Sequence, residues 1–125
     1  MNLSLVLPLP PKELSPNARL HYMAKAKETD RYRSMIQLLS FLEAGGAKAG
    51  AGRYRLTETY MIAGKRKHDV RNLFAAFKAG EDGLVDAGLL PGDDDSVLEH
   101  GPPRIERVKT KAEEGVVVEI EEVLT

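Results

Sequence analysis

The sequence contains no cysteine, so the chain has no disulfide framework, no thiol nucleophile and no cysteine-ligated zinc. Its apolar N-terminus, residues 1–11, has no basic segment and is interrupted by Pro8, Pro10 and Pro11. We therefore expect neither a signal peptide nor a membrane span there. These absences favour a cytoplasmic protein without a membrane partner.

Several nucleotide-binding and metal-binding motifs are also missing. There is no P-loop, no G-x-G-x-x-G fingerprint and no H-E-x-x-H zinc motif. The acidic run at residues 93–95 lacks the glycine and glutamate spacing of an EF-hand. His21, His68 and His100 show no ligand spacing, which favours structural or exposed roles, although basic neighbours make the first two candidate DNA contacts. Carboxylates and basic groups remain as the candidates for chemistry.

The 125 residues fit one domain, residues 1–125, because a second independent core would be hard to build at this length. Net charge is −1, but its distribution is uneven. Residues 1–67 hold 12 Lys or Arg against 5 Asp or Glu, whereas residues 68–125 hold 6 against 14. A basic half can bind phosphate and an acidic half can hold a divalent cation, although two solvated faces would give the same pattern.

The N-terminal half alternates between strand and helix patterns. A strand is predicted over residues 2–7, and a helix from Thr29 to Gly45. The apolar positions of that helix are Tyr32, Ile36, Leu39 and Leu42. A second strand is predicted over residues 53–62, with one face formed by Tyr54, Leu56, Tyr60 and Ile62. Glu58 is the single exception on this apolar face.

The C-terminal half predicts one more helix and two strands. The helix begins near Asp69 and ends at Gly88, and its glycines at 80 and 83 each cost about 1 kcal/mol unless something packs closely there. The helix's buried stripe is Leu73, Ala76, Phe77, Gly80 and Leu84. Strands at about 104–109 and 116–120 can form an antiparallel hairpin. The prediction is an α+β fold: about four strands in a small mixed or antiparallel sheet, with two main helices packed on it (β-α-β-α-β-β).

Two acidic segments are candidate metal ligands. Asp69 lies where a basic strand end meets a helix, and residues 93–95 follow that helix, so the loop can return over the helix start. Mg²⁺ or Mn²⁺ is favoured over zinc, because carboxylates are the only plausible ligands. An ordinary acidic turn is the plainer interpretation. Lys78 is either a surface partner of Asp82 at i+4 or an ammonium directed at a phosphate.

Three segments resemble the RusA family of Holliday-junction resolvases. The first is the proline-ended strand, followed by the polar basic loop at residues 15–21 and by Lys25 and Lys27. The second is residues 65–73, Lys-Arg-Lys-His-Asp-Val-Arg-Asn-Leu, which resembles the family's basic-Asp-x-Asp-Asn-Leu signature. The third is residues 78–91 together with the following aspartates, and it is the most specific of the three.

The resemblance implies a homodimer that binds four-way DNA junctions and nicks them with Mg²⁺. By position, Asp69 corresponds to a metal-binding aspartate and Lys78 to the family lysine. Asp94 fits the loop aspartate best and Asp95 is a further candidate ligand, while Asp93 could take the same role. The DNA-binding candidates are Arg19, His21, Lys25, Lys27, Lys65, Arg66, Lys67 and Arg71.

One departure from the family signature bears on activity. Arg71 stands where the signature has its second aspartate, so an oxygen ligand is replaced by a cation. Cleavage survives if Glu81 or Asp82 helps to hold the ion with Arg71 turned toward phosphate. Otherwise the chain is a junction-binding protein with weak or no cleavage. A small metal-binding regulator unrelated to DNA is a third hypothesis.

Overall fold

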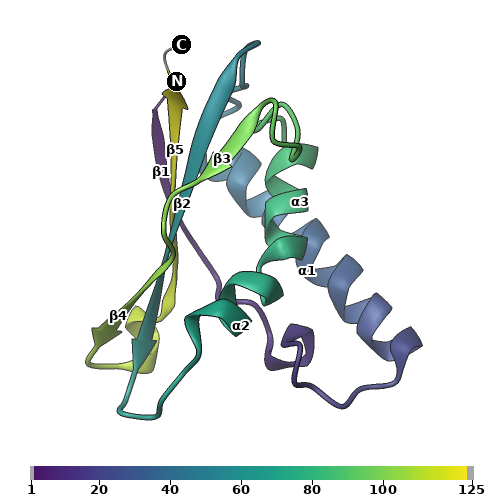
Figure 1. Cartoon of the computed structure of the whole chain (residues 1–125), viewed down its shortest axis with the longest axis vertical. Coiled ribbons are helices and arrows are strands. Elements are labelled where there is room, and N and C mark those ends of the chain that lie inside the picture. Colours follow the sequence, from purple (N-terminus) through teal and green to yellow (C-terminus); the bar gives the residue numbers. More distant parts are fainter. Residues whose placement is uncertain (1, 124–125) are drawn as a thin grey trace.

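The computed structural model describes residues 2–123 and contains a five-stranded mixed sheet with its helices on one face (Figure 1). The strand order is β1 (Leu3–Leu7), β5 (Gly115–Val123), β2 (Arg53–Ala63) and β3 (Leu98–His100). A fifth strand, β4 (Arg104–Val108), also pairs with β2. This is the α+β architecture that the sequence predicts.

The long central strand β2 organises the sheet. Along one edge it pairs antiparallel with β5, which in turn pairs antiparallel with β1. Along its other edge β2 pairs in parallel first with β3 and then with β4. Between β3 and β4 the backbone N–H of Gly101 donates to the carbonyl of Leu56 at 3.0 Å, which keeps the connecting segment on β2.

The predicted hairpin between the last two strands is wrong. β5 uses both of its edges, for β1 and for β2, so it has no free edge for β4. β4 runs parallel to β2 on the opposite side, and a short 3₁₀ turn, η2 (Lys111–Glu113), leads from β4 to β5. The short strand β3 was not predicted, because three residues carry too little periodicity to be recognised.

The helices differ in their bounds from the predicted ones. After a short 3₁₀ turn, η1 (Lys12–Leu14), helix α1 (Tyr22–Glu43) begins well before Thr29. The second predicted helix is divided at the fully buried Phe77 into α2 (Val70–Ala76) and α3 (Lys78–Asp86). Gly88, with φ of 81°, follows the end of α3 as predicted.

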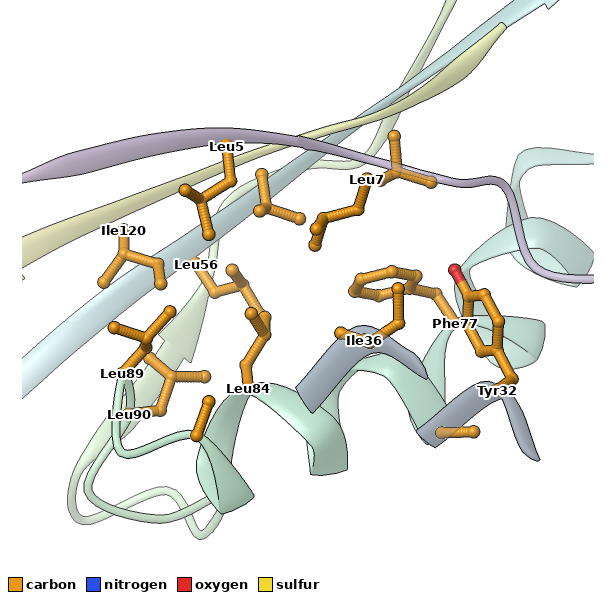
Figure 2. Packing of buried hydrophobic residues seen from close by; sticks show 14 of the residues in the cluster. Leu5, Leu7, Tyr32, Ile36, Leu56, Phe77, Leu84, Leu89, Leu90 and Ile120 are labelled. Atoms are coloured by element: carbon orange, nitrogen blue, oxygen red, sulfur yellow. The ribbon is translucent and has the colours of Figure 1, made fainter. Parts of the chain in front are cut away.

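The core lies between the helices and the covered face of the sheet (Figure 2). The sheet contributes alternate side chains, including Leu5, Leu7, Leu56 and Ile120, and these are at most 2% exposed. Figure 2 shows them facing Tyr32, Ile36, Phe77 and Leu84 of the helical layer. The strand alternation predicted for β1 and β2 is therefore confirmed.

The predicted apolar stripe of α1 is partly wrong. Tyr32 and Ile36 are buried, but Leu42 is 63% exposed. Ser40 takes the next inward position, four residues after Ile36, and its hydroxyl donates to the Ile36 carbonyl at 2.6 Å. The helix therefore keeps large apolar side chains on its outer side, namely Met35, Leu38, Phe41 and Leu42.

The close packing expected at the two glycines of α3 is present. A Cβ at Gly83 would lie 2.6 Å from the backbone carbonyl oxygen of Arg33 on α1. A Cβ at Gly80 would lie 2.6 Å from the ring of Phe77. Glycine at position 83 lets α1 and α3 approach this closely, and glycine at position 80 leaves room for the Phe77 ring. This packing offsets the helix propensity that glycine lacks.

Candidate functional site

A groove runs between the loop after β1 and the segment that leads from β2 into α2. The first wall is formed within residues 9–20 and the second within residues 62–76. The groove brings together Arg19 from one wall and Arg66, Lys67 and Asp69 from the other. Four of the predicted site residues, separated by up to 50 positions in the chain, therefore line one surface depression.

The cations of this region have no acidic partner among residues 2–123. Several arginines elsewhere form ion pairs, such as Arg33 with Asp86 and Arg53 with Glu99. In contrast, within residues 2–123, no ion pair involves any predicted DNA-binding cation. These cations are Arg19, Lys25, Lys27, Lys65, Arg66, Lys67 and Arg71. Their charge is thus available to a phosphate backbone.

Asp69 is both a groove residue and the N-cap of α2. Its Oδ1 accepts a hydrogen bond from the backbone N–H of Arg71 at 2.8 Å, which explains why α2 begins at Val70. The side chain is exposed to solvent in the groove. An exposed carboxylate at a helix N-terminus next to free cations can take part in metal or phosphate chemistry, but it also has this ordinary capping role.

A second hollow adjoins the groove and contains Lys25, Lys78 and Asp82. The two depressions share Ala76 as a lining residue. Lys78 is the first residue of α3, and its Nζ contacts Asp93 at 2.5 Å and Asp82 at 3.0 Å. The ammonium therefore lies between two carboxylates rather than free in solvent.

These contacts determine the charge state of Lys78. Burial alone would lower the pKa of the ammonium, but the hydrogen bonds to Asp93 and Asp82, with the negative charges of Asp82 and Glu81, raise that pKa above its usual value. The hydrogen bond from Lys78 in turn lowers the pKa of Asp93. Lys78 is thus held as a cation, which suits stabilisation of negative charge and does not suit a general base.

The acidic turn does not bring its three carboxylates together with Asp69. Asp93 faces Lys78, whereas Asp94 accepts hydrogen bonds from the backbone and the hydroxyl of Ser96, which lower its pKa. The backbone carbonyl of Asp95 accepts from Arg53 at 2.6 Å. Among residues 2–123, Asp69, Asp94 and Asp95 are not a group whose ligand atoms all lie within 4.8 Å. Their assignment as metal ligands stays a prediction.

The remaining predicted DNA contacts lie outside the groove lining. Lys27, Lys65 and Arg71 do not line it, and neither does His21. The Nδ1 atom of His21 instead accepts a hydrogen bond from the backbone N–H of Met23 at 3.2 Å and so caps α1. His68 does line the groove.

A largely buried group that the sequence patterns did not predict lies between α3 and the sheet. It comprises Glu58 of β2, Glu81 of α3 and His100 at the end of β3. One ligand atom from each residue lies within 4.8 Å of the other two. The one signal in the sequence is Glu58, the charged exception on an otherwise apolar strand face. Its partners are 23 and 42 positions away, so spacing could not reveal them.

The two glutamates of this group are deeply buried. Glu58 is 1% exposed and Glu81 is 5% exposed. Burial raises the pKa of Glu58 to about 7; the Tyr60 hydroxyl, which donates to it, opposes this rise, and the negative charge of Glu81 adds to it. Glu81 Oε2 lies 3.0 Å from Nε2 of His100, whose ring stacks edge-on against Phe74.

Comparison with known proteins gives a relative but no family. No family model matches the chain. A protein of Xylella fastidiosa described as uncharacterized is 33% identical over 99 residues. These residues are 78% of this chain and 63% of that protein, so the chain spans less than two thirds of that relative's length.

Within residues 2–123, no helix has the length and apolar character needed to cross a membrane.

Proposed function

We propose that the protein is a structure-selective endonuclease of the RusA type that binds four-way DNA junctions. The observation that carries the proposal is the groove whose lining includes the exposed carboxylate of Asp69 together with Arg19, Arg66 and Lys67, which form no ion pair within residues 2–123. Cations without acidic partners are suited to backbone phosphates, and such contacts hold DNA without reading its sequence. The three segments that resemble the RusA family contribute to the groove, the start of α2 and the acidic turn.

The chain's own groups have separate roles in this proposal. Arg19, Arg66 and Lys67 grip the phosphate backbone, and Arg71 in the first turn of α2 adds a further cation nearby. Lys78, kept protonated by its two carboxylate neighbours, stabilises negative charge on a phosphate that enters the adjoining hollow. The side chain would have to exchange Asp93 for that phosphate.

The expected Mg²⁺ would not have a three-carboxylate site here. Asp69, Asp94 and Asp95 are not gathered into a three-ligand site in the described part of the chain. Asp93, not Asp94, is the loop aspartate that meets Lys78. One or two carboxylates with several waters can hold Mg²⁺, so Asp69 would be the groove residue that holds the ion, and Mn²⁺ is an equally suitable test cation.

The resemblance also implies a homodimer, and we propose that a second copy is the partner. The outer side of α1 exposes Met35, Leu38, Phe41 and Leu42, each at least 39%. Apolar side chains exposed in this number on one helix are suited to an interface between protein chains.

The decisive experiment compares labelled four-way junction with matched duplex, with and without Mg²⁺ or Mn²⁺. Wild-type protein is expected to shift the junction and to nick it only with the cation. Asp69→Asn is expected to bind the junction but to lose about 100-fold or more in nicking rate. Asparagine still caps α2, so this variant removes charge without removing the helix start. Asp30→Asn, an exposed carboxylate on α1, is the matched control.

A junction-binding protein without cleavage is the second candidate. Arg71 in place of a carboxylate, and the lack of a three-carboxylate group around Asp69 among residues 2–123, favour it. A gel shift of the junction without products in either cation would identify this function. Equal, weak binding to junction and duplex in low salt would reject both candidates.

A further inference from the structure

We propose that Glu58, Glu81 and His100 bind one divalent transition-metal ion between α3 and the sheet. This site is distinct from the Asp69 groove and does not depend on the nuclease proposal. Three separate elements contribute to it: β2, α3 and the end of β3. One carboxylate oxygen from each glutamate and one imidazole nitrogen already lie within 4.8 Å of one another.

The position of Glu58 argues for a partner that is absent from the chain itself. Its inward-facing neighbours on β2 are Leu56 and Tyr60, both fully buried, and at 1% exposure Glu58 is as enclosed as they are. Burying an isolated carboxylate is costly, and a second carboxylate nearby adds repulsion. A simple core would have an apolar residue at this place.

One oxygen of Glu58 has no partner. Oε1 accepts a hydrogen bond from the Tyr60 hydroxyl, whereas Oε2 is buried with no hydrogen-bond partner among the described residues. It is the one buried side-chain polar atom of residues 2–123 left in this state. Buried polar groups are nearly always paired, so the free oxygen indicates a missing proton or cation.

The contact between Glu81 and His100 does not account for this oxygen. A charged imidazole would satisfy Glu81 Oε2 at 3.0 Å, but it would leave Oε2 of Glu58 as it is. A metal ion among the three groups satisfies both glutamates and the ring nitrogen at once. It also offsets the two negative charges that burial brings together.

The donor set selects the kind of ion. Two carboxylates and one imidazole suit Zn²⁺ or Mn²⁺ better than Mg²⁺ or Ca²⁺, which prefer oxygen ligands alone. Two ligand atoms that each lie about 2.1 Å from one ion are at most about 4.2 Å apart. The three ligand atoms already lie within 4.8 Å of one another, so they need to move together little or not at all to bind the ion.

The group is open to solvent at one end. The His100 side chain is 31% exposed, whereas that of Glu81 is 7% exposed, so the imidazole lies at the outer end of the group. An ion held by three protein ligands keeps positions for water or a further ligand on the open side.

The test is metal-dependent thermal unfolding of the full chain after EDTA treatment and dialysis. Zn²⁺ or Mn²⁺ in hundredfold excess over its Kd is expected to raise the Tm of wild-type protein by about 5–10 °C. Calorimetric titration is expected to give one ion per chain. Mg²⁺ at the same concentration is expected to give a much smaller rise.

Matched variants separate this site from the groove. Glu58→Gln keeps the side-chain size and removes the buried charge, and His100→Gln changes a partly exposed residue, so both are expected to remain folded. Both should lose the metal-induced rise in Tm, while Asp69→Asn should keep it. No rise in wild type, or a rise that survives in folded Glu58→Gln and His100→Gln, would overturn the proposal. A rise lost only in Asp69→Asn would also overturn it and would favour a metal in the groove.

Discussion

At the scale of single residues, Gly83 decides how closely α1 and α3 pack. Alanine gains about 1 kcal/mol of helix propensity over glycine. Its Cβ, however, would lie 2.6 Å from the carbonyl oxygen of Arg33, and backbone cannot rotate away as a side chain can. We predict that Gly83→Ala lowers the free energy of unfolding by about 1–2 kcal/mol, measured by urea denaturation. Gly50→Ala, whose Cβ would contact only the Tyr54 hydroxyl at 4.0 Å, is the control. A Gly83→Ala variant that is more stable than wild type would contradict the packing argument.

The sequence marked unusual single residues but did not reveal the groups that face them. Two helical glycines signalled a close approach, and Glu58 signalled an anomaly on an apolar strand face. The identity of the opposing groups was inaccessible, because Arg33, Glu81 and His100 reach these positions only through tertiary packing. Local pattern thus locates an unusual residue but does not name its partner.

At the scale of elements, one bidentate ion pair joins α1 to α3. Arg33 donates from Nε to Asp86 Oδ2 at 2.6 Å and from Nη2 to Oδ1 at 3.0 Å. The hydrogen bond from Arg33 lowers the pKa of Asp86, with burial opposing it. A lowered carboxylate pKa contributes stability above the unfolded-state pKa and loses it as pH falls through the folded-state pKa. We predict that Asp86→Asn has a lower Tm than wild type at pH 7, and that the difference shrinks below about pH 4.

Thermal unfolding at several pH values, followed by circular dichroism, tests this prediction. Glu28→Gln, which removes the exposed pair with Arg31 on α1 alone, is the matched control and is expected to change Tm less. A Tm difference for Asp86→Asn that stays constant from pH 7 to pH 3 would show that the ion pair is not its source.

Element types were more predictable than their ends and pairings. The period of apolar residues predicted β1, α1 and β2, because those segments are long enough to show it. The sequence did not predict that the helix divides at Phe77, because its buried stripe continues across this point through Ala76, Gly80 and Leu84. The hairpin prediction failed because two adjacent strands can equally pair with the two edges of a third, as β4 and β5 do with β2.

At the scale of the whole molecule, folding turns the uneven charge of the sequence into a surface. Arg19 comes from the loop after β1, and Arg66 and Lys67 follow β2, yet all three line one groove. The charge count predicted a basic region but not its shape. The prediction that Asp69 and the acidic turn share a metal ion depended on where the loop at residues 93–95 lies in the fold. Contacts such as that of Lys78 with Asp93 set this position.

If the groove binds DNA through these cations, its affinity must depend on salt. Each phosphate contact releases a condensed counterion, so the logarithm of the binding constant falls linearly with the logarithm of salt concentration. We predict that Arg19→Gln and Lys67→Gln each weaken junction binding and each reduce the magnitude of this slope by about 1. Fluorescence anisotropy with a labelled four-way junction at several salt concentrations measures both quantities.

Arg31→Gln supplies the control for this measurement, because Arg31 is exposed but already paired with Glu28 at 3.6 Å on α1. It removes the same charge from the molecule without removing a groove cation, so its slope should match that of wild type. A salt slope that is reduced equally in Arg19→Gln, Lys67→Gln and Arg31→Gln would mean that net charge governs the binding. A smaller slope in the two groove variants alone assigns the phosphate contacts to the groove, because only local contacts release counterions there.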